Sequence, residues 1–177
     1  MLLEHGLMNE TQAPPSSCLI CGAFGAMAAC VVRQEGASLW RCSACGVVQR
    51  GASLWNREEA QAYYQDYYPN DITPFDPITG RRYQRILDVF QGIRPPGRLL
   101  EVGAGQGHFL TVAETRGWKA VGLEISVSGL RLLQKLKREQ GWQFEVLGDD
   151  LLKAPLLERS FGAATLFEVI EHLGDPA

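Results

Sequence analysis

Two closely spaced pairs of cysteines could hold a metal ion. Cys18 and Cys21 form one C-x-x-C pair, and Cys42 and Cys45 form a second pair twenty residues further along. A glycine directly follows each pair and permits the tight turn in which backbone amides hydrogen-bond to thiolates. Four thiolates fill the tetrahedral shell of Zn²⁺ and leave no position for water, so the spacing predicts a structural zinc site. The alternative is a small sheet with reduced cysteines. The fifth cysteine, Cys30, is expected in a buried core.

A glycine-rich turn in LLEVGAGQGHFL, residues 99–110, could bind a ligand through its backbone. Its G-x-G-x-G pattern has His108 where a dinucleotide-binding turn requires a third glycine, and no lysine follows as in a phosphate-binding loop. Glu101 precedes the turn and Glu124 ends the next predicted strand. A carboxylate at the position of Glu124, after the second strand, can accept hydrogen bonds from both hydroxyls of a ribose. Two acids disfavour a phosphate and favour a cationic, amino-bearing ligand.

An E-x-x-E-H motif, formed by Glu168, Glu171 and His172, begins at the end of the last predicted strand. If a helix begins here, Glu168 and His172 lie at i and i+4 on one face. Three roles remain open for the motif. His172 is the candidate catalytic residue, a general base because histidine titrates near neutral pH. Alternatively the three residues bind a divalent metal ion, or they are structural and His172 closes a loop.

The elements that position these residues alternate between strands and helices. Apolar residues at i, i+3, i+4 and i+7 predict a helix over 79–91, preceded by a tyrosine-rich helix over 57–68. Strand–helix–strand alternation then predicts an α/β domain with a parallel sheet and helices on both faces. The predicted strands are 98–105, 119–126, 143–150 and 162–169, and the predicted helices between them are 108–117 and 128–141.

The glycine turn with its two acids resembles the class I S-adenosylmethionine-dependent methyltransferases over about residues 81–176. This resemblance implies a Rossmann-like domain in which the turn lies under the methionine part of the cofactor and Glu124 binds the ribose. It places Asp149 and Asp150 at the adenine amino group, and Phe167 and Glu168 beside the methionine part. The expected cofactor-binding residues are Glu101, Gly103, Ala104, Gly105, Gly107, Glu124, Ile125, Asp149, Asp150, Phe167 and Glu168.

The cysteine pairs followed by YYQDYY resemble methyltransferases with an N-terminal zinc ribbon, including sugar C-methyltransferases. Some ubiquinone-pathway O-methyltransferases carry a motif that looks like E-x-x-E-H. The resemblance implies methyl transfer to an O or C atom of a small-molecule or sugar-type acceptor. In that family the tyrosine-rich segment helps to wall the acceptor site, which makes Tyr63, Tyr64, Tyr67 and Tyr68 candidate lid or substrate residues. The alternative is that they only pack the ribbon against the larger domain.

Charge and hydropathy indicate which binding partners to expect. The chain of 177 residues has a net charge of −3 and a pI of about 5.6, which argues against a nucleic-acid surface and against the alternative of a zinc-ribbon RNA methyltransferase. No apolar run is long enough to span a membrane, and the first residues do not resemble an export signal, so a cytoplasmic protein is expected.

The predicted organisation has four parts: a flexible leader (1–17), a zinc ribbon (18–50), a tyrosine-rich helix and linker (51–78), and the methyltransferase domain (79–177). The resembling family has seven strands, and this sequence ends after the fourth. The domain is therefore expected to be incomplete, and a truncated, catalytically inactive fragment with at most residual zinc or cofactor binding is a further alternative.

Overall fold

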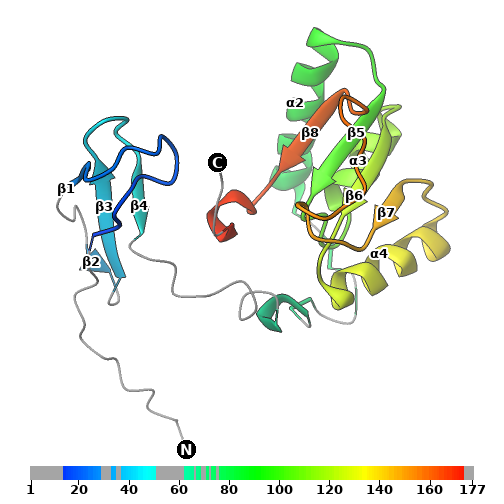
Figure 1. The fold of residues 1–177 in the computed structure, drawn as a ribbon. Coiled ribbons are helices and arrows are strands. Elements are labelled where there is room, and N and C mark those ends of the chain that lie inside the picture. The colour runs from blue at the N-terminus through cyan, green and yellow to red at the C-terminus, as the bar shows by residue number, and fades with distance from the viewer. Residues whose placement is uncertain are drawn as a thin grey trace, which may run out of the picture. The chain divides into compact units, whose positions relative to one another are not determined.

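The computed structural model describes residues 14–28, 33–34, 37–50, 62–65, 67–68, 71, 73–74 and 76–173. They belong to two compact units, one formed by Met1–Asn56 and Leu173–Ala177 and one formed by Arg57–His172, and each is considered by itself (Figure 1). Cys30 and most of the predicted leader lie outside the described residues, as does the side chain of Glu171. Within the described part of the chain, no helix has the length and apolar character needed to cross a membrane.

The N-terminal unit is a small antiparallel sheet in which a central strand, β3, pairs with the other three. Its register places Met27 opposite Cys42 and Trp40 opposite Gln49. The second cysteine pair therefore begins at the end of the central strand. The strands are β1 (Met27–Ala28), β2 (Arg33–Gln34), β3 (Ala37–Cys42) and β4 (Val48–Arg50).

The tyrosine-rich segment is helical at residues 62–65, whereas the sequence predicts a helix over 57–68. Residues 57–61 lie outside the described part, but the predicted end is wrong, because Tyr67 and Tyr68 are not helical. The proline at position 69 disfavours a helical conformation at Tyr68. The Tyr68 amide donates to Ser128 Oγ at 3.1 Å, so a tertiary contact takes the place of a helical hydrogen bond.

Helix α2 (Pro77–Ile93) begins two residues before and ends two residues after the predicted range of 79–91. The Asp76 carboxylate caps it by accepting from the amides of Ile78 and Thr79 at 2.7 and 3.0 Å. A proline at the first helical position needs no hydrogen-bond partner, which favours this start. The predicted apolar face is confirmed: Leu87 is fully buried, and Tyr83, Ile86 and Phe90 pack against the same core.

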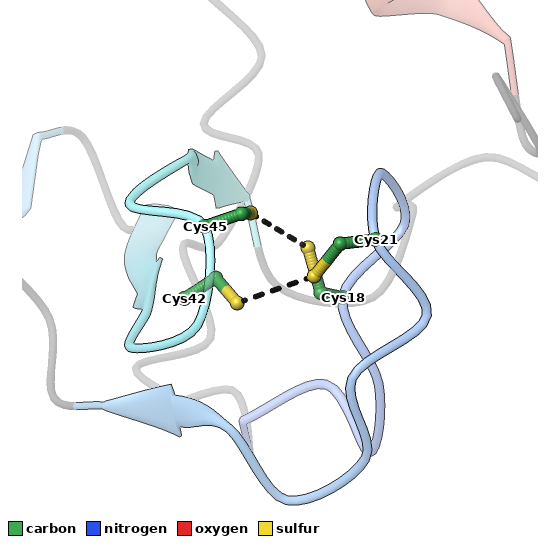
Figure 2. Close-up of side chains that lie close together, drawn as sticks. All are labelled: Cys18, Cys21, Cys42 and Cys45. Atoms are coloured by element: carbon green, nitrogen blue, oxygen red, sulfur yellow. Dashed lines mark hydrogen bonds between the residues drawn. The ribbon is translucent and has the colours of Figure 1, made fainter.

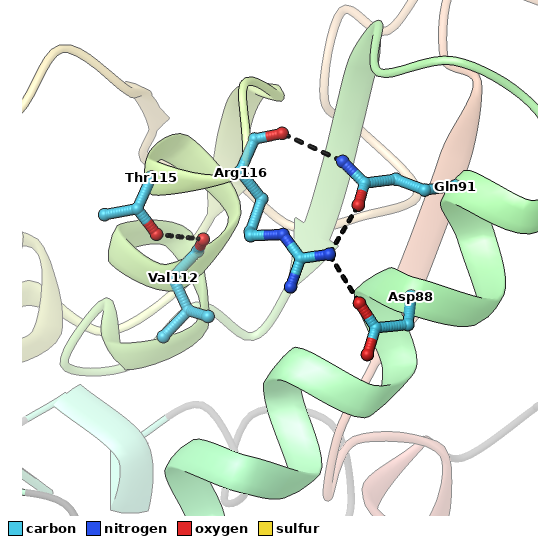
Figure 3. A network of polar contacts seen from close by, with 5 residues as sticks. All are labelled: Asp88, Gln91, Val112, Thr115 and Arg116. Carbon is cyan, nitrogen blue, oxygen red and sulfur yellow. Dashed lines mark hydrogen bonds and ion pairs between the residues drawn. The ribbon is translucent and has the colours of Figure 1, made fainter.

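Polar contacts join α2 to the end of α3 (His108–Thr115) (Figure 3). The Arg116 guanidinium forms an ion pair with Asp88 and donates to Gln91 Oε1 at 2.6 Å. In return, Gln91 Nε2 donates to the Arg116 carbonyl at 3.0 Å, and the Thr115 hydroxyl donates to the Val112 carbonyl at 2.7 Å. These bonds satisfy carbonyl groups that a helix end leaves unpaired, and they fix α2 against the end of α3 that is remote from the glycine turn.

The second unit contains the predicted parallel sheet, with the strand order β7-β6-β5-β8 (Figure 1). Central β5 pairs in register with β6, Glu101 opposite Gly122, and with β8, Glu101 opposite Thr165. Because all four strands are parallel, their carboxyl ends lie at one edge of the sheet. The strands are β5 (Arg98–Val102), β6 (Lys119–Leu123), β7 (Glu145–Leu147) and β8 (Ala163–Leu166).

Side chains alternate between two cores along these strands. Leu99 and Ala120 enter a core with α2, α3 and α4 (Val127–Gln140), whereas Leu100 and Val121 enter a second core. In the described residues the three helices therefore lie on one face, and the chain from 147 to 169 supplies the apolar side chains that cover the other. The second core is completed by Leu147, Leu151, Ala154, Leu156, Phe161 and Val169.

Candidate functional site

The glycine turn connects the carboxyl end of β5 to α3, as predicted. Gly103, Gly105 and Gly107 have φ angles of 72°, 53° and 78°, a region that favours glycine. Gly107 is the N-cap of α3, and a Cβ on it would lie 2.7 Å from Leu133 Cδ2. A Cβ on Gly103 would lie 2.5 Å from Val169 Cγ2. Both backbone conformation and close packing therefore require glycine here.

The amides of the turn already donate within the protein. Gly103 and Ala104 donate to the Leu123 carbonyl at 2.8 and 3.1 Å, and Gly107 donates to the Ala104 carbonyl at 2.8 Å. The Gly105 amide donates to Glu124 Oε2 at 2.7 Å. A phosphate-binding loop needs free amides that point at its ligand. These four amides do not form such a cradle, which agrees with the sequence pattern.

Glu124 follows β6 directly and is only 3% exposed. Its Oε2 accepts from the Gly105 amide, and its Oε1 accepts from the Ser126 amide at 2.8 Å. The Ser126 hydroxyl in turn caps α4 by accepting from the Gly129 amide at 2.8 Å. A carboxylate oxygen can accept more than one hydrogen bond, so both oxygens keep capacity for a ligand.

Glu101 lies on β5, next to β6, the strand that Glu124 follows, and is 4% exposed. Its Oε2 is buried and makes no hydrogen bond within the described residues. Burial raises the pKa of the Glu101 carboxyl well above its usual value, the nearby charge of Glu124 raises it further, and a hydrogen bond with the Leu110 backbone offsets part of this increase. A buried acid that lacks a partner and lies beside a second acid favours a cationic ligand.

The other predicted cofactor residues lie at the same edge of the sheet but differ in their contacts. Half-buried Asp149 and Asp150 follow β7: Asp149 Oδ1 accepts from the Asp150 amide at 2.8 Å, and Asp150 Oδ1 accepts from Leu152 at 2.9 Å. Ile125 follows Glu124 and is half-buried. Phe167 follows β8, and its ring packs on Tyr83 and Phe109 with centroid separations of 5.5 and 5.0 Å.

The E-x-x-E-H motif does not form the predicted helical face. Glu168 has a φ of 55°, and only Ile170–His172 form a short 3₁₀ helix, η1. Glu168 and His172 therefore do not lie at i and i+4 of one helix, and that prediction is wrong. A left-handed residue cannot belong to a right-handed helix. His172 instead contacts the tyrosine-rich segment, because Nδ1 lies 3.0 Å from Tyr64 Oη.

Aromatic rings gather beside His172. The Tyr64 ring packs edge-on against His172 with centroids 5.6 Å apart, and Tyr63 and Tyr67 pack against Tyr64 at 5.1 and 5.5 Å. Tyr63 and Tyr67 are about half exposed, at 51% and 54%. Tyr68 packs on Tyr67 at 5.2 Å and reaches the glycine turn. The sequence singled out these tyrosines, but their individual partners follow only from the tertiary structure.

The four cysteines of the N-terminal unit converge (Figure 2). Their sulfurs lie within 4.8 Å of one another, with Cys18 and Cys45 3.7 Å apart and Cys21 and Cys42 also 3.7 Å apart. Tetrahedral Zn²⁺ with bonds of about 2.3 Å requires sulfurs about 3.8 Å apart. The donor set and its spacing therefore fit this ion.

Two turns shape the cysteine cluster. Gly22 and Gly46 have φ angles of 69° and 78°, and their amides donate to the carbonyls of Cys18 and Cys42 at 2.9 Å. Hydrogen bonds from backbone amides, chiefly that of Cys21, lower the pKa of the Cys18 thiol to about 7. At Cys45 a hydrogen bond from the Val47 backbone also lowers the pKa of the thiol, but burial and the neighbouring cysteines outweigh it and raise this pKa. Metal ions bind the thiolate form, so the first turn favours a metal-binding state at Cys18.

Comparisons with known proteins agree with this fold. A family described as a methyltransferase domain matches residues 75–177. That match spans more than half of the sequence, so the chain belongs to this methyltransferase family, whose fold is that of S-adenosylmethionine-dependent enzymes. No curated protein sequence matches the chain.

Several solved structures are similar to this chain. One is geranyl diphosphate C-methyltransferase from Streptomyces coelicolor A3(2), in complex with Mg²⁺, geranyl diphosphate and S-adenosyl-L-homocysteine. It is 15% identical with a TM-score of 0.50, and the match covers 63% of this chain and 55% of that one. A geranyl diphosphate methyltransferase is 21% identical (TM-score 0.44; 49% and 33% covered), and WbdD is 22% identical (TM-score 0.42; 48% and 21% covered). This chain therefore spans between a fifth and just over half of the length of these proteins.

Proposed function

We propose that the unit formed by Arg57–His172 binds S-adenosylmethionine and takes part in methyl transfer to an O or C atom of a small-molecule or sugar-type acceptor. The observation that supports this most strongly is the pair of buried acids, Glu101 and Glu124, beside a turn of positive-φ glycines. Because Glu101 Oε2 is buried and makes no hydrogen bond within the described residues, and because four amides of the turn already donate within the protein, the site fits a cationic nucleoside that carries no phosphate.

In this proposal Glu124 accepts hydrogen bonds from the ribose, and Asp149 and Asp150 accept from the adenine amino group. Glu101 compensates the positive charge of the ammonium group of the amino-acid part, which lies over the glycine turn. Phe167 lies beside the methionine part, and its ring is held there by packing on both Tyr83 and Phe109. The proposed cofactor-binding residues are Glu101, Gly103, Ala104, Gly105, Gly107, Glu124, Ile125, Asp149, Asp150, Phe167 and Glu168.

The acceptor lies, in our proposal, beside His172 and the tyrosines. The bound cofactor supplies an electrophilic methyl group, and the protein supplies orientation and proton transfer. A Nδ1–H that donates to Tyr64 Oη leaves Nε2 of His172 free to take the proton from an acceptor O–H or C–H group. The exposed rings of Tyr63 and Tyr67 then form an apolar wall that excludes water.

Cys18, Cys21, Cys42 and Cys45 hold one structural Zn²⁺ ion in this proposal. Four thiolates leave no open coordination position, so the ion stabilises the N-terminal unit and does not take part in methyl transfer.

Titration of the 177-residue chain with S-adenosylhomocysteine by calorimetry tests the cofactor site. We expect saturable binding that Glu124→Ala weakens at least tenfold. Glu145→Ala is the matched control, because this carboxylate lies on β7 and is 70% exposed. Equal affinities for the wild type and Glu124→Ala would contradict the assignment of Glu124, and an absence of binding to the wild-type chain would contradict the proposed function.

A further inference from the structure

The phenol of Tyr68 lies directly against the glycine turn. A Cβ placed on Gly105 would lie 2.9 Å from Tyr68 Oη, 3.2 Å from Cζ and 3.3 Å from Cε1. Tyr68 precedes the turn by almost forty residues and belongs to none of its elements. The hydroxyl end of this side chain therefore faces the backbone position over which the proposed site receives its ligand.

Two features hold the Tyr68 hydroxyl there as a neutral donor. The backbone amide of Tyr68 donates to Ser128 Oγ at 3.1 Å, which ties the residue to the first turn of α4. Burial raises the pKa of the Tyr68 hydroxyl above its usual range, and the charge of Glu124 adds to this increase. The hydroxyl thus keeps its proton at any physiological pH.

The carboxylate of an amino-acid ligand needs a hydrogen-bond donor near the glycine turn. An amino-acid ligand carries an ammonium group and a carboxylate, and the two buried acids, Glu101 and Glu124, suit only the ammonium group. The amides of Gly103, Ala104, Gly105 and Gly107 already donate to protein oxygens, so they do not provide for the carboxylate. The Tyr68 hydroxyl is a donor that lies against Gly105.

We propose that the Tyr68 hydroxyl binds the cofactor by donating a hydrogen bond to the carboxylate of its amino-acid part, with Ser128 as the positioning residue for Tyr68. This inference rests on the proposed cofactor site. It assigns Tyr68 to the cofactor, whereas Tyr63, Tyr64 and Tyr67 remain on the acceptor side.

Two ligands that differ in the amino-acid part test the assignment. S-adenosylhomocysteine has the carboxylate, and 5′-methylthioadenosine lacks the whole amino-acid group. We expect Tyr68→Phe to weaken S-adenosylhomocysteine binding about tenfold or more and to leave methylthioadenosine binding unchanged, because a hydrogen bond to a charged group is lost only with the first ligand. Ser128→Ala should also weaken S-adenosylhomocysteine binding relative to methylthioadenosine binding, but by a smaller factor than Tyr68→Phe. Thr115→Val, which removes a hydroxyl at the end of α3 that is remote from the glycine turn, is the control and changes neither affinity.

The outcomes separate this inference from the proposed function. If Tyr68→Phe weakens both ligands equally or neither of them, while Glu124→Ala weakens both, the cofactor site stands and the role of the Tyr68 hydroxyl is overturned. If the wild-type chain binds neither ligand, or Glu124→Ala leaves both affinities unchanged, the proposed site itself fails, and the inference fails with it. Calorimetric titration of the full chain provides both affinities.

Discussion

Tyr64 Oη and His172 Nδ1 lie 3.0 Å apart although 108 residues separate them in the sequence. This contact joins the tyrosine-rich segment to the loop that follows β8. It also orients an imidazole ring, because a hydrogen bond at one ring nitrogen determines what the other nitrogen can do. Among the proposed acceptor-side residues, His172 is therefore the one whose ring orientation the structure constrains most directly.

The first prediction concerns the tautomer of His172. If its Nδ1–H donates to Tyr64 Oη, neutral His172 carries its proton on Nδ1, and Tyr64→Phe removes this preference. Nitrogen-15 NMR of imidazole distinguishes the two tautomers, and the chain has only three histidines, so His172→Gln identifies the signal. A proton on Nε2 in the wild-type protein would contradict the role of His172 as a base through that nitrogen. For a known acceptor, His172→Gln should lower kcat roughly 10²- to 10⁴-fold and leave S-adenosylhomocysteine affinity unchanged.

The second prediction concerns the pH dependence of stability that Glu101 produces. Its pKa is raised in the folded state, so the folded protein retains a proton that the unfolded chain releases as the pH rises above about 4.3. Stability therefore falls with increasing pH, from the ordinary pKa of glutamate up to the raised value. Glu101→Gln removes this loss. We expect its Tm to match that of the wild type near a pH of about 4.3 and to exceed it at neutral pH.

Thermal melts followed by circular dichroism across this pH range measure the difference. Glu145→Gln serves as the control, because its side chain is 70% exposed and a neutral replacement there should shift Tm little at any pH. A Glu101→Gln variant that is less stable than the wild type at neutral pH would show that the carboxylate is compensated in the folded protein.

Much of this site could be predicted from the sequence because its parts are local. The glycine turn, Glu101 and Glu124 could be predicted because each lies in or just after a short apolar strand. In a parallel sheet the carboxyl ends of such strands lie at one edge, so these residues are expected close together. The cysteine pairs are equally local, since each pair forms a single turn ended by a glycine, Gly22 or Gly46.

The remaining parts depend on tertiary contacts that periodicity does not encode. The predicted helical face of Glu168 and His172 fails because Glu168 adopts a φ of 55°, which no pattern in its neighbours requires. The contact between Tyr68 and Gly105 pairs a segment interrupted by proline with a turn far along the chain. The tyrosine-rich segment identified the tyrosines as candidates, but the sequence does not predict that Tyr64 contacts His172 or that Tyr68 contacts the glycine turn.

The third prediction concerns the metal content of the cysteine cluster. We expect one zinc per wild-type chain by elemental analysis and little or none in Cys21→Ser, which removes one of four ligands. Cys30→Ser is the control and should retain the metal, because Cys30 does not belong to either C-x-x-C pair. Since the cysteines and the glycine turn belong to different compact units, Cys21→Ser should keep wild-type affinity for S-adenosylhomocysteine. A stoichiometric zinc content in Cys21→Ser would contradict the predicted ligand set.

The last prediction concerns Gly107 at the start of α3. It compares the cost of replacing a glycine that has a positive φ and close neighbours with the effect of replacing an ordinary helical glycine. Gly107 has a φ of 78°, which costs a residue with a side chain about 1 kcal/mol, and its Cβ would lie 2.7 Å from Leu133 Cδ2 and 3.1 Å from Leu136 Cδ2 in the core. We therefore expect Gly107→Ala to lower the free energy of unfolding by about 2 kcal/mol or more, because strain and overpacking add. Gly92 lies in α2 with open space around it, so Gly92→Ala should raise stability by up to about 1 kcal/mol. Urea denaturation compares the two variants, and a Gly107→Ala midpoint at or above that of the wild type would contradict the geometry of the turn.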